Sequence, residues 1–189
     1  MQEAPDLAPA TKTLINALEL NRFAYAIIGG LAVIINGYDR ATTDIDAVVW
    51  DLDDRLEELI SVLGAVGIQF RIKDGIRTAR SVRVILLQTD HGVNIDLSMG
   101  VLPFEQEVIS RASSMRLGDE LIGQIATVED LLIMKLVASR DRDLDDVTRL
   151  FELNPDVSHA RIRRLVTEFA EALERPEIIS NLDEKLKSI

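Results

Sequence analysis

Hydrophobic and polar positions follow two different periods along the first 125 residues. A helix is expected over 12–21, because Leu14, Ile15 and Leu18 fall on one helical face. Short apolar or alternating runs bounded by turn residues predict strands instead. The strands expected on this basis cover 23–28, 44–50, 68–72, 82–88, 93–98 and 121–126, and the helices between them cover 31–36, 51–64 and 104–111.

The pattern after residue 126 is helical. Thr127 is expected to cap the first of these helices, and the acidic residues after it suit the start of a helix dipole. The chain therefore predicts an α/β fold, with a small mixed, twisted sheet and flanking helices over 1–126 and a helical C-terminal subdomain over 127–189. The helices expected in that subdomain cover 128–139, 143–153 and 158–175.

Composition limits the chemistry that this fold can carry. The chain is 47% hydrophobic and has few aromatic residues, which predicts an aliphatic core. It has no cysteine and only two histidines, so thiolate metal sites are excluded and a histidine-based zinc centre is disfavoured. Any metal ion here would be a hard cation bound by oxygen.

The net charge and the N-terminal segment limit which binding partners and which cellular location we expect for the protein. The net charge of −11 opposes broad, non-specific binding to nucleic acid. Residues 1–11 lack the basic and apolar regions of a signal peptide, and the apolar runs are shorter than the ~18 residues of a membrane span. We expect a cytoplasmic protein with no membrane partner.

Three aspartates fall on predicted strands. Asp44 and Asp46 are two residues apart, so their side chains point to one side of the sheet, about 6.6 Å apart along the strand. Asp96 sits on a later strand between apolar neighbours, where an ionised carboxylate is costly to bury without a partner. The three residues form either a site for hard cations or a solvated strand face.

A glycine pair and a lysine are candidate anion contacts. Gly29 and Gly30 follow a buried strand and open a short helix, where backbone N–H groups can hold an anion, although tight turn geometry also explains glycine there. Lys135 lies in an apolar helical run and either pairs with an anion or extends along the surface to solvent. On a continuous helix Asp146 shares the face of Lys135, while Asp143 lies about 80° away, which favours Asp146 as the site residue.

Basic residues gather in the segment 71–83, and only Asp74 offsets them. In a chain of net charge −11 this concentration predicts either a contact for phosphates or for a substrate such as RNA, or a solvated loop and edge strand protected against aggregation by charge. The basic residues of the segment are Arg71, Lys73, Arg77, Arg80 and Arg83.

These motifs together resemble the nucleotidyltransferase superfamily, which has the DNA polymerase β-like fold. The resemblance covers about residues 23–98. It implies that the glycine pair opens the helix that holds a triphosphate and that the three aspartates hold two Mg²⁺ ions, with Mn²⁺ as a substitute. Relatives often have Gly-Ser where this chain has Gly29-Gly30. The matching residues are Gly29, Gly30, Arg40, Thr42, Asp44, Asp46 and Asp96.

The second half resembles a narrower group, the AbiEii-like nucleotidyltransferases, which include type IV toxins and MenT-type enzymes. The match runs from Val128 through Lys135 to Asp143 and Asp146. It implies transfer of a nucleoside monophosphate from an NTP to RNA, tRNA or protein, and a toxin paired with an antitoxin protein. A small-molecule nucleotidyltransferase and a non-catalytic regulatory relative are the alternatives.

The expected site combines both resemblances. Asp44, Asp46 and Asp96 are the predicted metal ligands, and Asp96 would also help to deprotonate the acceptor. Lys135 is expected to neutralise the triphosphate and counts as a fourth catalytic residue. The predicted nucleotide-binding residues are Gly29, Gly30, Arg40, Thr42, Lys135 and Asp146.

Overall fold

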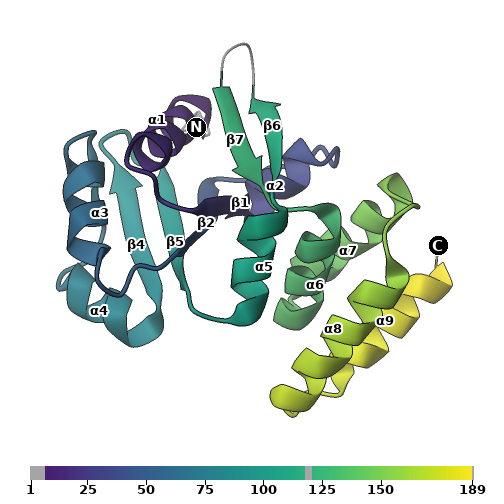
Figure 1. Ribbon diagram of the computed structural model, residues 1–189. Helices are drawn as coiled ribbons and strands as arrows, with labels where there is room; N and C mark the ends of the chain where they lie inside the picture. The colour runs from purple at the N-terminus through teal and green to yellow at the C-terminus, as the bar shows by residue number, and fades with distance from the viewer. Residues whose placement is uncertain (1–6, 118–120, 189) are drawn as a thin grey trace. The chain divides into compact units, whose positions relative to one another are not determined.

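The computed structural model describes residues 7–117 and 121–188 and divides the chain into two compact units (Figure 1). The sheet unit comprises the residues up to Leu31 together with Ala41–Ala126, and the helical unit comprises Ala32–Arg40 together with the chain from Thr127 onward. The elements are α1 (Leu7–Leu20), β1 (Tyr25–Ile28), α2 (Gly29–Ile35), β2 (Asp44–Trp50), α3 (Leu56–Gly64), β3 (Ile68–Phe70), α4 (Gly75–Val82), β4 (Val84–Thr89), β5 (Asn94–Gly100), α5 (Pro103–Arg111), β6 (Ser113–Leu117), β7 (Leu121–Ile125), α6 (Val128–Ala138), α7 (Asp141–Leu153), α8 (His159–Ala172) and α9 (Glu177–Ser188).

The sheet unit contains a mixed sheet with the strand order β3-β4-β5-β2-β1-β7-β6. The central pair, β2 and β5, is parallel, while β1 and β4 run antiparallel to them on either side. The predicted mixed α/β architecture is therefore confirmed. The position of β5 beside β2 matters most, because it brings two distant parts of the sequence into register.

The burial pattern of β2 and β5 explains how the sheet presents polar residues. On both strands the odd-numbered residues are buried, as Ile45 and Ile95 illustrate. The even-numbered residues at the start of each strand are more open: Asp44, Asp46 and Asp96 are half-buried, and Asn94 is exposed. Because side chains alternate between the faces of a sheet, one face builds the aliphatic core and the other exposes carboxylates.

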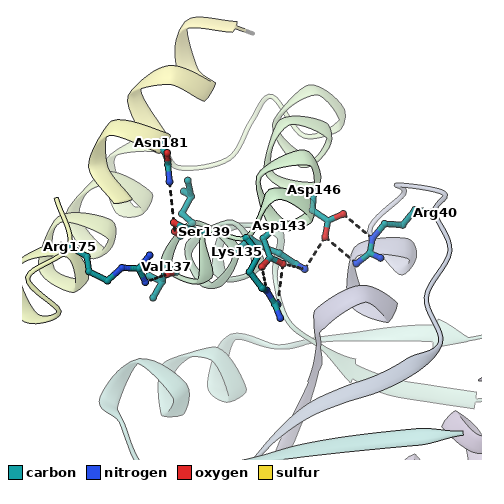
Figure 2. A network of polar contacts seen from close by, with 10 residues as sticks. Arg40, Lys135, Val137, Ser139, Asp143, Asp146, Arg175 and Asn181 are labelled. Atoms are coloured by element: carbon teal, nitrogen blue, oxygen red, sulfur yellow. Dashed lines mark hydrogen bonds and ion pairs between the residues drawn. The ribbon is translucent and has the colours of Figure 1, made fainter. Parts of the chain in front are cut away.

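The helical unit is held by apolar packing and by polar contacts at the end of α6. α6 packs against α7 and α8, and α8 packs against α9. The backbone carbonyl of Val137 accepts a hydrogen bond from Arg175 at 3.0 Å, and Ser139 Oγ accepts one from Asn181 at 3.1 Å (Figure 2). These bonds satisfy groups at a helix end that would otherwise lack partners.

The sequence prediction places most elements correctly and misplaces a few. Thr127 caps α6 as expected, its hydroxyl accepting from the N–H of Asp130. α1 begins at Leu7 rather than after Thr11, and α3 begins at Leu56 rather than at 51. α4 and β6 are absent from the prediction, because both segments are short and contain few apolar residues. No described helix combines the length and apolar composition that a membrane crossing requires.

Candidate functional site

Asp46 and Asp96 lie directly opposite each other on the adjacent parallel strands β2 and β5. Neighbouring strands are about 4.8 Å apart, and paired residues point to the same face. Two residues that are fifty positions apart in sequence thus place carboxylates side by side. The row continues to Ile28 on β1 and to Leu86 on β4.

Asp44 begins β2 on the same face as Asp46. Its carboxylate oxygen Oδ1 accepts a hydrogen bond from the hydroxyl of Thr42 at 2.8 Å. The bond spans two residues and restricts the rotamer of Asp44. Thr42, predicted to bind nucleotide, here bonds to a predicted metal ligand.

Gly29 makes room for Asp46. Its φ is +64°, a conformation that glycine adopts without steric cost, and a Cβ at this position would lie 2.0 Å from Asp46 Oδ2. Both backbone conformation and space therefore require glycine here. Together with the buried Gly30, Gly29 forms the first turn of α2, as the sequence predicts.

Asp96 is engaged by an arginine that follows β3. Arg71 Nη1 donates to Asp96 Oδ1, and Arg71 Nη2 donates to Asp96 Oδ2 at 3.2 Å. Nη1 also donates to the carbonyl of Leu87 at 3.1 Å, which anchors the guanidinium on β4. The side chains of Arg71 and Asp96 are 24% and 31% exposed, so the pair is open to solvent.

The three aspartates have the ligand chemistry that a divalent cation requires, and two of them are paired on adjacent strands. Carboxylate oxygens are the ligands that Mg²⁺ prefers, and Asp46 and Asp96 are neighbours on one face. As the side chains lie, however, no three acidic or histidine residues in the described chain are grouped closely enough to hold a metal ion. The assignment of Asp44, Asp46 and Asp96 as metal ligands stays a prediction.

Lys135 lies in the helical unit, and its ammonium group pairs with two carboxylates (Figure 2). Nζ is 2.7 Å from Asp143 Oδ1 and 2.8 Å from Asp146 Oδ2. The three side chains are 9%, 3% and 1% exposed, respectively. Lys135 is enclosed and paired with anions, as predicted, but these anions are carboxylates of the protein. Its contact with a triphosphate stays a prediction.

The preference for Asp146 over Asp143 applies only to a continuous helix, and the helix is interrupted between Lys135 and the two aspartates. α6 ends at Ala138, Ser139 adopts a left-handed conformation with φ +53°, and α7 starts at Asp141. The chain turns between the two helices and brings both aspartates to Lys135.

Arg40 completes the network from the other segment of the helical unit. Its Nε is 2.8 Å from Asp146 Oδ1, and its Nη2 donates to Asp146 Oδ2 at 3.1 Å (Figure 2). A two-pronged arginine–carboxylate pair is among the stronger ion pairs, and here both partners are largely buried. Arg40 and Asp146, both predicted to bind nucleotide, bind each other.

Asp143 is kept ionised by its neighbours. Burial by itself would raise the pKa of its carboxyl group, but hydrogen bonds from Arg140 and Lys135 outweigh this effect and lower the pKa below the ordinary value. Arg140 Nε lies 2.5 Å from Asp143 Oδ2. The network is thus a set of mutually compensated charges.

Four of the five basic residues in the segment 71–83 pair with carboxylates. Besides Arg71 with Asp96, three of its arginines bind carboxylates in the sheet unit, at 3.1, 2.7 and 2.7 Å. These pairs are Arg77–Asp74, Arg80–Glu57 and Arg83–Asp53. The segment also forms α4, and Gly75 and Arg80 of this helix line, together with Phe70 of β3, an open surface hollow of about 580 Å³. A large unpaired basic surface is therefore not what the segment presents.

The pairing of Arg71 with Asp96 was not predicted from sequence. Arg71 stood out only as one of several basic residues in the segment. Its backbone N–H donates to Leu86, which itself pairs with Asp96, so Arg71 extends the same row across the sheet. The position of β3 beside β4 would have been the signal, and the sequence pattern did not predict that pairing.

Comparison with known proteins gives one family match. Residues 10–180 match the model of a family described as nucleotidyltransferase of unknown function (DUF6036). No curated protein sequence matches the chain.

Solved structures share the fold at low sequence identity. A solution structure of the antibiotic-resistance factor ANT(2'')-Ia aligns with a TM-score of 0.59 and 13% identity over 90% of this chain and 94% of that one. A crystal structure of ANT(2'')-Ia in complex with adenylyl-2''-tobramycin aligns with a TM-score of 0.60 and 12% identity over 88% of this chain and 98% of that one. A crystal structure of an antigenic nucleotidyltransferase-like protein from Paracoccidioides brasiliensis aligns with a TM-score of 0.53 and 16% identity over 94% of this chain and 92% of that one.

Proposed function

The chain belongs to the DUF6036 family of nucleotidyltransferases, and we propose that it transfers a nucleoside monophosphate from an NTP to an acceptor hydroxyl, releasing pyrophosphate. The observation that carries this proposal is the direct pairing of Asp46 with Asp96 on adjacent strands. Asp44 lies on the same face, and the hydroxyl of Thr42 restricts its carboxylate.

In this proposal Asp44, Asp46 and Asp96 hold two Mg²⁺ ions, which Mn²⁺ can replace. Such ions, when bound, neutralise charge on a transferring phosphoryl group and orient the attacking and leaving oxygens. The chain's own part is to hold the carboxylates in place through Thr42 and Gly29. A carboxylate oxygen of Asp96 would accept the proton of the acceptor hydroxyl.

The phosphate contacts belong to the same proposal. The backbone N–H groups of Gly29 and Gly30 at the start of α2 would bind the triphosphate, since backbone donors at this position are not used by the helix itself. Arg40, Lys135 and Asp146 are left out of the proposed catalytic set, because they already form ion pairs with one another.

For the acceptor, we favour a small molecule over RNA. Four arginines of the basic segment 71–83 are paired with carboxylates, and the net charge is −11, so a polyanion finds little uncompensated positive charge. The structure of the fold neighbour ANT(2'')-Ia in complex with adenylyl-2''-tobramycin supports a small-molecule acceptor. At 12% sequence identity, this similarity supports a shared fold but does not identify the substrate of this chain.

RNA or protein as the acceptor is the second candidate, and it would come with the toxin role and an antitoxin partner. Its support is the resemblance of Val128–Asp146 to the AbiEii-like group. A cytoplasmic location is part of either proposal.

Label transfer distinguishes the candidates. The protein is incubated with Mg²⁺ and each of the four NTPs labelled at the α-phosphate, together with either total cellular RNA or a pool of hydroxylated small molecules that includes tobramycin. We expect label in a low-mass product and none with Asp46→Asn. Label in RNA would replace the small-molecule reading with the RNA reading. Label in neither pool, with NTP binding intact, would count against transfer to both acceptor classes.

The toxin role is tested separately in cells. Expression of the wild-type chain should leave growth unaffected if the acceptor is an added small molecule. Growth arrest that Asp44→Ala relieves would instead support the toxin reading.

A further inference from the structure

Arg71 lies at the end of the row of residues that contains the proposed metal ligands. The row runs from Asp46 on β2 to Asp96 on β5 and Leu86 on β4, and Arg71 follows next to Leu86. Residues in one row of a sheet point to the same face, so the guanidinium of Arg71 reaches past Leu86 to the carboxylate of Asp96.

The guanidinium engages both oxygens of Asp96. Arg71 Nη1 bonds to Oδ1 and Nη2 bonds to Oδ2, and the additional bond to the carbonyl of Leu87 fixes the orientation of the group. The guanidinium brings a positive charge to the carboxylate. A cation that is to coordinate Asp96 must compete with it.

The exposure of the pair makes such competition feasible. With side chains 24% and 31% exposed, Arg71 and Asp96 can exchange partners with ions from solvent, and water screens their attraction. A divalent cation held also by Asp46 would bring twice the charge to Asp96.

We propose that Arg71 is a positioning residue that holds the Asp96 carboxylate and competes with the divalent cation for it. The inference rests on the proposed metal-dependent function. It implies that a metal ion binds at Asp96 only by displacing the guanidinium, so the site binds divalent cations more weakly than its three carboxylates alone would.

The proposal is tested by Mn²⁺ binding to the full chain, measured by calorimetry and by the paramagnetic resonance of free Mn²⁺, without nucleotide. Arg71→Gln should bind Mn²⁺ roughly three- to tenfold more tightly than wild type, because the competing partner is gone. The matched control is Arg77→Gln, which removes the same charge from the exposed pair with Asp74. Its Mn²⁺ affinity should equal that of wild type.

A second readout uses the reciprocity of linked equilibria. If metal and arginine compete for Asp96, then saturating Mn²⁺ should abolish the interaction between positions 71 and 96 that a double-mutant cycle of Arg71→Gln and Asp96→Asn detects by urea unfolding. Persistence of that interaction in saturating Mn²⁺ would overturn the proposal.

The outcomes separate this inference from the proposed function. Equal or weaker Mn²⁺ binding by a folded Arg71→Gln variant, with wild type binding the ion, would overturn the competition and leave the metal site intact. No Mn²⁺ binding by either protein would overturn both. Tighter binding by Arg71→Gln that Arg77→Gln reproduces would show a general charge effect and would also overturn it.

Discussion

The sheet unit and the helical unit each contain a cluster of charged residues, and the two clusters differ in how they are neutralised. In the sheet unit, Asp96 has a partner that is open to solvent, with both side chains about a quarter to a third exposed. In the helical unit, Lys135 and its two aspartates are all at most 9% exposed. An ion pair near solvent is weak and exchangeable, whereas a buried one is costly to break.

This difference teaches how to interpret charged residues in a motif. A carboxylate on a half-buried strand can exchange its partner for a ligand. A lysine with two buried carboxylates has its charge satisfied by the protein. We therefore expect substitutions in the sheet cluster to affect activity and substitutions in the helical cluster to affect stability.

The largest expected effect is on activity, from Asp46→Asn. Loss of the central carboxylate should reduce label transfer by roughly 10³-fold or more, since the charge that develops on the phosphoryl group loses its counter-ions. The free energy of unfolding in urea should change little. The matched control, Asp74→Asn, alters an exposed aspartate paired with Arg77 and should keep full activity. Retained transfer in Asp46→Asn would remove this residue from the catalytic set.

Lys135→Met should destabilise the protein by about 3 kcal/mol, because it leaves Asp143 and Asp146 with one cation fewer in a buried setting. Arg40 and Arg140 still pair with these aspartates, which keeps the loss at the lower end of the range for buried pairs. Urea unfolding measures the change.

The control for this substitution is Lys73→Met at an exposed position, which should stay within about 0.5 kcal/mol of wild type. If Lys135→Met unfolded like wild type and lost only its affinity for NTP, the lysine would have the triphosphate role that the sequence predicts. The closed ion cluster would then be the wrong interpretation.

Gly29→Ala should cost about 1–3 kcal/mol and also reduce transfer, because the new Cβ both strains a positive φ and strikes the carboxylate of Asp46. Gly92→Ala is the matched control. Gly92 has φ +83°, and a Cβ there meets nothing within 4 Å, so this variant carries the backbone strain alone. Activity loss in Gly29→Ala but not in Gly92→Ala would isolate the contact with Asp46. Equal activity in the two variants would contradict it.

The sequence predicts the strands of the central sheet well, because their apolar periods are strong. β2 is predicted over the residues that it occupies, and the alternation within it places Asp44 and Asp46 on the face opposite Ile45. Strand order is a different matter. It depends on long-range pairing, which a single sequence does not display, so the row that joins Asp46, Asp96 and Arg71 emerges only in the structure.

In the helical cluster, the sequence identifies the important residue but not the geometry around it. The sequence correctly singles out Lys135 as an enclosed cation, since apolar residues flank it. It predicts separate helices over 128–139 and 143–153, but not the path of the chain between them, where Ser139 adopts φ +53° and both aspartates of α7 come to Lys135. A helical wheel is valid only within one helix, and here the break lies between the residues being compared.

The smallest expected effect is a pH dependence of stability that originates at Asp143. Its folded-state pKa is lowered from the ordinary value of 3.8. The ionised form is thus favoured by folding, and the stabilisation is fully present above that value and is lost as the pH falls through the lower, folded-state pKa. Urea unfolding from about pH 5 down to about pH 2.5 should show this loss. Because other carboxylates titrate in the same window, the comparison is with variants: Asp143→Asn should flatten the curve, while Asp145→Asn, which removes the same charge at an exposed position two residues away, should leave its slope near that of wild type. Parallel curves for wild type and Asp143→Asn would mean that Arg140 and Lys135 do not hold this carboxylate in its charged form.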